Sequence, residues 1–209
     1  GDGVEYGWAA AIARSNVGVA ECAFLAAEMK GLSEEVKSPP PPPSAITSFE
    51  EALQLLSLCD AKVKNHPTSL LIRARIQCNL AHALLYPTDQ KTPRVTKPNL
   101  KKASDAGRAA LKIYDSLSDD ADGADAGRAL ALVAACYARV DAAVSAEGLY
   151  KSAIDGFLRS RYQKHPGTVL AYRDCLRGYA ALCEGWEKRE GEGAKLREES
   201  VVVEREGFE

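Results

Sequence analysis

Helical periodicity runs through almost the whole chain, and proline interrupts it. Apolar residues recur every three or four positions, whereas strand-like alternation and hairpin turns between alternating runs are nearly absent. Because proline is accepted only in the first turn of a helix, the prolines mark where helices end and begin. The pattern predicts an all-α fold, with helical residues 4–31 in two pieces and further helices over residues 48–65, 68–86, 98–117, 125–140, 145–162, 168–183 and 186–200.

The dipeptide His-Pro occurs twice, at residues 66–67 and 165–166, each time just before a new apolar helical pattern. A residue that precedes proline is biased away from helical geometry, so each dipeptide should end one helix and open the next. We expect Thr68 and Thr168 to be the N-caps of the two helices that follow.

Two segments without helical periodicity interrupt the chain. Residues 38–44 include five consecutive prolines, which impose extended polyproline II geometry and cannot continue a helix. The next helix is therefore expected to begin at Ser48, which has the spacing of a capping box with Glu51. The second segment, residues 87–97, is a loop rich in lysine and arginine.

Small side chains recur where paired helices would cross. Ala146, Tyr150 and Ala153 are spaced i, i+4 and i+7, and the preceding helix carries Ala134 shortly before Tyr137. This order of small and bulky residues resembles the tetratricopeptide repeat, in which a small residue of each helix lies at the crossing. The spacing between successive second helices exceeds the standard unit of about 34 residues, which is similar to the kinesin-light-chain variety of the repeat.

The resemblance implies a right-handed α-α superhelix of about four helix pairs that forms one domain over residues 1–209. The implied repeats span about residues 15–64, 66–117, 125–163 and 167–200. Each repeat must stack on its neighbours to bury its apolar face, and the curved array then has a concave face. First-helix side chains would line this face and bind a partner, namely Arg75, Cys78, His82, Arg128, Ala131, Ala135 and Arg139.

Four glycines lie inside predicted helices. A glycine in an exposed helix costs roughly 1 kcal/mol relative to alanine. Close backbone contact between neighbouring helices would offset this cost, so we expect all four at helix crossings. They are Gly107, Gly127, Gly148 and Gly178.

Composition and charge restrict the classes of partner. The net charge of −2 and the pI near 6.0 give no reason to expect nucleic acid or an anionic membrane as the main partner. No apolar run approaches the roughly 20 residues that span a bilayer, so no transmembrane segment is expected. The six cysteines lack the clustered spacing of a disulfide scaffold or a zinc site, which indicates an intracellular reducing compartment.

The start of the chain bears on its location. The chain begins at Gly1 and its only methionine is Met29, which indicates a fragment, a tagged product or a processed mature form. An organellar location, such as the mitochondrion, and a cytoplasmic location both fit this start.

Sequence motifs for catalysis and for bound ions are missing. The chain has no Gly-x-Ser-x-Gly, no Cys-x-x-Cys, no phosphate-binding Gly-x-x-x-x-Gly-Lys and no His-Glu-x-x-His. The segment from Ser118 imitates a calcium loop, but Ala129 holds the twelfth place, where a bidentate glutamate is needed. None of the three histidines has a second ligand at metal spacing. We therefore expect no enzyme activity, no cofactor and no metal site.

The basic segment has two interpretations. Its cations could dock an acidic protein, a lipid head group or RNA, but a solvated insertion is favoured, and the lack of interleaved aromatic residues disfavours RNA further. The proline run is likewise favoured as a spacer over a ligand for SH3- or WW-type modules. The cations concerned are Lys91, Arg94, Lys97, Lys101 and Lys102.

Together these expectations favour a non-enzymatic protein-protein interaction scaffold. It would be an adaptor, an accessory subunit or an assembly factor of a larger complex, and its concave face would bind a partner helix or an extended peptide. The alternative is a regulatory or substrate-recruiting module of a larger multidomain enzyme. Both interpretations use the same concave face.

Overall fold

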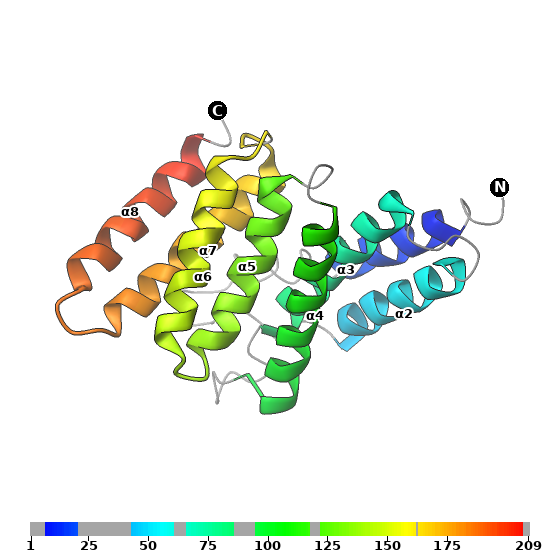
Figure 1. Cartoon of the computed structure of the whole chain (residues 1–209), viewed down its shortest axis with the longest axis horizontal. Helices are drawn as coiled ribbons and strands as arrows, with labels where there is room; N and C mark the ends of the chain where they lie inside the picture. The colour runs from blue at the N-terminus through cyan, green and yellow to red at the C-terminus, as the bar shows by residue number, and fades with distance from the viewer. Residues whose placement is uncertain are drawn as a thin grey trace. The chain divides into compact units, whose positions relative to one another are not determined.

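The computed structural model describes residues 7–20, 43–60, 66–85, 95–117, 122–161 and 163–206 of the 209-residue chain (Figure 1). Over these ranges every regular element is an α-helix, so the all-α prediction is confirmed for the described residues. A helix over residues 7–20 is followed in chain order by α2 (Pro43–Asp60), α3 (Pro67–Leu85), α4 (Lys97–Ser116), α5 (Gly123–Ala138), α6 (Ala143–Leu158), α7 (Pro166–Glu184) and α8 (Glu190–Glu206).

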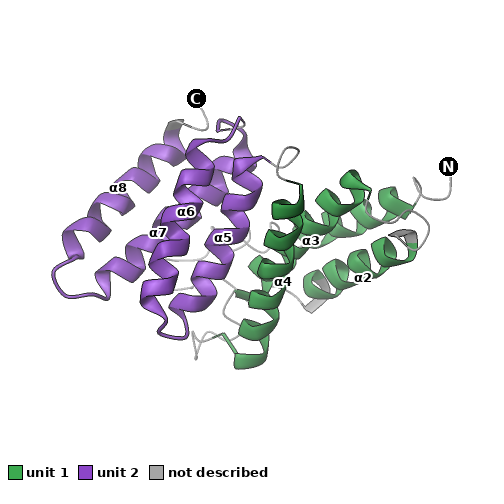
Figure 2. Cartoon of the chain, viewed as in Figure 1, with its two compact units in different colours: residues 1–117 green, residues 118–209 purple. Residues whose placement is uncertain are grey.

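The chain divides into two compact units (Figure 2). Unit 1 consists of residues 1–117 and unit 2 of residues 118–209. Within unit 1, α3 packs against both α2 and α4; within unit 2, α5 packs on α6, α6 on α7 and α7 on α8. Neighbouring helices in the sequence are thus neighbours in space in each unit. The predicted single superhelix over residues 1–209 concerns both units together and stays a prediction.

In unit 1, the helix over residues 7–20 packs against the next two helices. A Cβ atom built on Gly18 would lie only 2.9 Å from a ring carbon of Phe49 in α2. The Trp8 ring lies 5.0 Å from the ring of His66, at the start of α3. Phe49 is 1% exposed and belongs to the core of the unit. Glycine at position 18 therefore lets the first helix approach this aromatic ring closely.

In unit 2, glycines bring α5 and α6 into backbone contact. A Cβ atom on Gly123 would lie 2.6 Å from the carbonyl oxygen of Gly156, and one on Gly127 would lie 2.9 Å from that of Ala153. Cβ atoms essentially never approach other atoms so closely, so a larger residue at either position would push the helices apart. The expected close contact at Gly127 is confirmed.

The same expectation is wrong at Gly148. This residue is exposed on α6, and a Cβ atom there would meet no atom within 4 Å among the described residues. Gly178 of α7 does meet a neighbour, because its Cβ would lie 2.6 Å from the Tyr150 hydroxyl. Gly107 is buried in α4. A glycine inside a helix thus marks a crossing only where tertiary packing brings another element to it.

Both His-Pro dipeptides begin a helix, but histidine rather than threonine provides the cap. The Nδ1 atom of His165 accepts a hydrogen bond from the Gly167 N–H at 3.2 Å, and His66 Nδ1 accepts one from the Thr68 N–H at 3.3 Å. Proline at the first helical position has the right φ and needs no N–H partner, so the residue before it becomes the cap. The prediction of Thr68 and Thr168 as N-caps is wrong, since both lie in the first turn.

The start of α2 also differs from the prediction. The helix begins at Pro43, the last proline of the run, and Ser48 lies inside it with 1% exposure. Proline is favoured in the first turn of a helix, so the last proline of a run can itself be the first helical residue. Of the predicted loop 38–44, residues 38–42 lie outside the described residues and residues 43–44 belong to α2.

The last helix is displaced toward the C-terminus relative to the prediction of residues 186–200. Residues 185–189 form the connection, in which Lys188 has a left-handed φ of 68°, and α8 runs from Glu190 to Glu206. The three valines from Val201, which follow the predicted end of the last helix at residue 200, lie within α8. Gly193 permits the contact with α7, because a Cβ there would lie 3.0 Å from the Ala180 carbonyl oxygen.

Candidate functional site

The four residues predicted to bind a partner from α5 follow one side of that helix. Their spacing of three, four and four residues places them in one stripe. Arg128, Ala131 and Ala135 are half-buried, whereas Arg139 is exposed. Arg139 Nη1 donates a hydrogen bond to the Ala135 carbonyl oxygen at 3.1 Å, so the guanidinium folds back over the end of the helix.

A second exposed stripe lies on α7, the neighbour of α5 in unit 2. Ala131 of α5 and Ala171 of α7 pack against the same buried cluster. The repeat pattern does not point to the α7 stripe, because residues 167–200, the predicted fourth repeat, fit the tetratricopeptide pattern only loosely. The one signal in the sequence is the helical period, since the members of the stripe recur at i, i+4, i+7 and i+11. They are Leu170, Asp174, Arg177 and Ala181.

Ion pairs with α8 hold the charged side chains of α7. Glu204 accepts hydrogen bonds from Arg173 Nη1 at 3.0 Å and from Arg177 Nη2 at 3.1 Å, and Arg173 Nη2 lies 2.8 Å from Asp174 Oδ1. Burial raises the pKa of Glu204, but the two arginines outweigh it and lower the net value. The polar part of the α7 stripe is therefore fixed in place by the terminal helix.

The predicted site residues of unit 1 have different environments. Arg75 is exposed on α3 and His82 is half-buried. Cys78 is 1% exposed, so its thiol belongs to the core and not to an accessible surface. These three residues lie in a different unit from the α5 stripe, so their membership in one continuous face stays a prediction.

The basic segment is only partly described. Lys91 and Arg94 lie outside the described residues, whereas Lys97, Lys101 and Lys102 lie in the first two turns of α4. Thr96, at the end of the predicted loop 87–97, is the N-cap of this helix. All three lysines are exposed.

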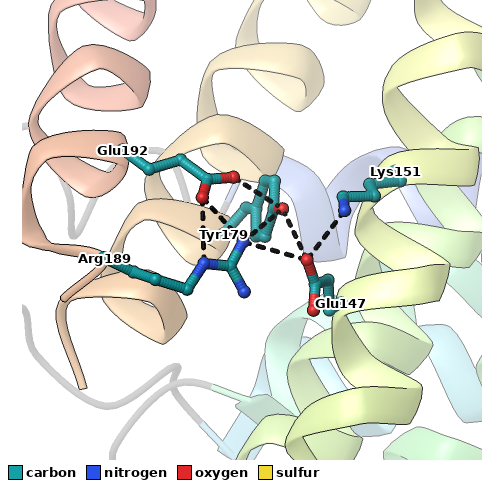
Figure 3. Close-up of polar contacts among 5 residues, drawn as sticks. All are labelled: Glu147, Lys151, Tyr179, Arg189 and Glu192. Atoms are coloured by element: carbon teal, nitrogen blue, oxygen red, sulfur yellow. Dashed lines mark hydrogen bonds and ion pairs between the residues drawn. The ribbon is translucent and has the colours of Figure 1, made fainter. Parts of the chain in front are cut away.

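The densest polar cluster joins three elements of unit 2 at the end where α7 turns into α8 (Figure 3). Glu147 of α6 lies 2.9 Å from Arg189 Nη2 and 2.8 Å from Lys151 Nζ. Arg189 Nε donates to Glu192 of α8 at 2.9 Å. The Tyr179 hydroxyl of α7 lies 3.1 Å from Glu147 and 3.0 Å from Glu192. We call these five residues the Glu147–Arg189 network.

The electrostatics of this network oppose acid–base catalysis. Hydrogen bonds from Arg189 and Lys151 lower the pKa of Glu147 to about 2. Burial, together with the hydrogen bond to Glu192, raises the pKa of Tyr179. A general acid or base works best with a pKa near the working pH, and both shifts lead away from neutrality. The network is therefore a structural tie between α6, α7 and α8.

A second polar tie lies at the opposite end of unit 2. Asp122 caps α5 by accepting from the Ala124 N–H at 2.9 Å. The same carboxylate accepts hydrogen bonds from the Ser160 hydroxyl and from the Arg161 N–H, which follow α6. Burial raises the pKa of Asp122, but these hydrogen bonds outweigh it and lower the net value. One carboxylate thus fixes the start of α5 against the end of α6.

Two other kinds of site are absent from the described ranges. No three side chains of the metal-binding types group closely enough there to hold a metal ion. None of the helices in those ranges is long and apolar enough to cross a membrane.

Comparisons of the chain with known protein families, with curated proteins and with solved structures give no match. The resemblance to the tetratricopeptide repeat therefore stays a prediction. A functional conclusion has to come from the residues and the geometry of the chain itself.

Proposed function

We propose that this chain is a non-enzymatic protein-interaction module that binds a partner helix or extended segment on a face formed by α5 and α7. The observation that carries the proposal is that these two first helices are neighbours, each with a stripe of accessible small and charged side chains. We call this surface the α5/α7 face. It consists of Arg128, Ala131, Ala135 and Arg139 on α5 and of Leu170, Asp174, Arg177 and Ala181 on α7.

The arrangement of helices in unit 2 supports a tetratricopeptide-like architecture. Antiparallel pairs α5–α6 and α7–α8 follow one another, and the first helices of the two pairs also pack together. Small residues lie at the α5–α6 crossing, as in that repeat. We propose a right-handed superhelix of about four such pairs, in which first helices line the concave side.

The chemistry of the α5/α7 face suits a polypeptide partner. Alanines at positions 131, 135 and 181 leave room for a partner backbone, and arginine is enriched in protein interfaces because it combines apolar contact with directed hydrogen bonds. Arg177 is already fixed by Glu204, so little side-chain entropy is lost when it binds a partner.

In a cell, this module would be an adaptor, an accessory subunit or an assembly factor of a larger complex. The same face would serve a regulatory or substrate-recruiting module of a larger enzyme. The described cysteines Cys78, Cys136, Cys175 and Cys183 are buried and form no disulfide, which supports a reducing compartment.

Site-specific photo-cross-linking tests this function. A benzoylphenylalanine at Ala135, on the α5/α7 face, is expected to cross-link one protein in a fixed ratio, as measured by quantitative mass spectrometry. The matched control carries the same residue at Ser152, an exposed position of α6 outside the face. Equal labelling from both positions, or no protein partner from either, would contradict the proposal. The Arg139→Glu variant should weaken the cross-link from Ala135.

A further inference from the structure

The exposed side of α4 in unit 1 carries a basic stripe. Lys97, Lys101 and Lys112 are exposed and recur at spacings of four and eleven residues, which places them on one side of the helix. Arg108 is exposed on the same side. Fifteen residues of helix separate the first lysine from the last, a length of about 22 Å. We call Lys97, Lys101 and Lys112 the α4 lysine stripe.

The three lysines form no ion pair with a carboxylate within the described part of the chain. None of them lies within 4.0 Å of an acidic oxygen there. Lys102, one position outside the stripe, differs because it forms an ion pair with Glu50 of α2. A carboxylate can thus be bound at the start of α4, but the intramolecular one reaches Lys102 and leaves the stripe available.

The partial charge at the end of a helix does not explain why lysines lie at the start of α4. The N-terminus of a helix carries partial positive charge, so lysines there are unfavourable and acidic residues are favourable. The first turn of α4 has no acidic residue and begins with Lys97. Helix α8 follows the usual rule, with Glu190 and Glu192 in its first turn and Arg205 in its last. Lys97 and Lys101 therefore lower the stability of α4, and carboxylates of another molecule would relieve that cost.

We propose that the α4 lysine stripe binds an acidic segment of a partner protein. Charge complementarity with the unneutralised lysines identifies the partner as anionic. Asp105 and Asp115 lie on the same side of α4 and would repel the uniform negative charge of a phosphate backbone or an anionic membrane. A protein segment can place its own basic residue opposite these carboxylates. The stripe lies in unit 1, whereas the α5/α7 face lies in unit 2.

The charge of the two units supports this location. Residues 1–117 hold 14 basic and 12 acidic side chains, whereas residues 118–209 hold 13 basic and 17 acidic ones. Only unit 1 has a net positive charge, so an acidic segment is attracted to the unit that carries the stripe.

Binding of a fluorescent acidic peptide in which single lysines interrupt the glutamates (Glu-Glu-Glu-Lys, repeated three times) to the full chain, followed by anisotropy, tests the proposal. The Lys97→Glu/Lys101→Glu variant is expected to bind at least about tenfold more weakly, and the affinity of the unmodified chain should fall as salt is added. The matched control is Lys164→Glu/Lys195→Glu, which makes the same change of charge at exposed positions of unit 2 and should bind as the unmodified chain does.

A stability readout separates a binding role from simple misfolding. Glutamate is favourable at a helix N-terminus, so Lys97→Glu/Lys101→Glu should unfold at a higher temperature while it loses the peptide. The proposal is overturned if this acidic peptide does not bind, or if both double variants lose it equally. It is also overturned if oligouridylate or phosphatidylserine vesicles bind better than the peptide through the same lysines, because the partner would then be RNA or a membrane.

Discussion

Units 1 and 2 are built from similar helices but are held together differently. In unit 2, polar ties join different helices at both ends, through Glu147 with Arg189 and through Asp122 with Ser160. In the described part of unit 1, the ion pairs between helices, such as Arg14 with Glu51, are substantially exposed. Exposed pairs contribute at most about 1 kcal/mol, so the described part of unit 1 depends more on apolar packing, besides the hydrogen bond from Asn79 to Ser15. Helix content alone therefore says little about how firmly a helical array is fixed.

Buried polar atoms without a hydrogen-bond partner are a second difference between the described parts of the two units. Within the described ranges, the buried side-chain atoms that lack a hydrogen-bond partner are Trp8 Nε1, Ser48 Oγ and Gln77 Oε1, all in unit 1. Each such atom costs about 1–3 kcal/mol of desolvation. We expect unit 1 to be the less stable of the two units.

Removing one large core ring from each unit has the largest expected effect. Phe157→Ala in unit 2 and Phe49→Ala in unit 1 should each cost about 3–5 kcal/mol, since both rings are at most 2% exposed. Hydrogen exchange should show lost protection only in the unit that carries the change. If either substitution removes protection throughout both units, the two units form one cooperative body and the comparison fails.

A pair of glycine substitutions tests the packing of unit 2. Gly127→Ala should destabilise by about 1–3 kcal/mol, because the new methyl group would lie 2.9 Å from a backbone oxygen of α6. Gly148→Ala, at an open position of α6, should instead stabilise by about 0.5–1 kcal/mol. Urea unfolding measures both. If both substitutions change the free energy of unfolding in the same direction, the α5–α6 contact at Gly127 has room for a methyl group.

Breaking the Glu147–Arg189 network should lower the stability of unit 2 toward that of unit 1. Glu147→Gln removes a carboxylate with 18% side-chain exposure and is expected to cost about 1–2 kcal/mol at pH 7. Because the pKa of Glu147 is lowered from 4.5 to about 2, its contribution is present above pH 4.5 and lost as the pH falls toward 2. The stability difference between the unmodified chain and the variant should shrink over that interval. A difference independent of pH would exclude this electrostatic origin.

The histidine caps should each give a small effect, and that of His66 should be slightly larger because its ring also lies 5.0 Å from the Trp8 ring. His66→Ala and His165→Ala each remove a side-chain acceptor at a helix N-terminus and should cost about 1 kcal/mol. Asparagine at either position should retain most of the stability, since its side chain can accept the same hydrogen bond. Thermal unfolding of the four variants measures this. If the asparagine variants lose as much stability as the alanine variants, the histidines have a role other than capping.

Much of the helix pattern was predictable because it depends on local chemistry. Apolar periodicity and proline positions located seven helices, and the His-Pro dipeptides were identified as helix starts. The caps were misassigned because threonine is the commoner cap, although proline at the first helical position selects the residue before it. The start of α8 was misplaced because Trp186 and Arg189 belong to the connection, where the guanidinium stacks over the indole at 4.8 Å.

The candidate sites were harder to predict because they depend on neighbours. Cys78 follows the same helical period as Arg75, yet only burial shows that its thiol is in the core. The stripe on α7 has no distinctive motif, so its exposure became visible only with the packing of α7 against α6 and α8.

The sequence by itself determined the class of structure, since helix propensity, apolar period and proline geometry act within a few residues. Only the tertiary structure decided which residues of a given type lie in close contact with another helix. Gly127 and Gly148 are both glycines inside helices of similar length, but only Gly127 lies against the backbone of another helix. The physical reason is that close packing and ion pairing depend on distances between segments far apart in the chain, and local preferences do not fix those distances.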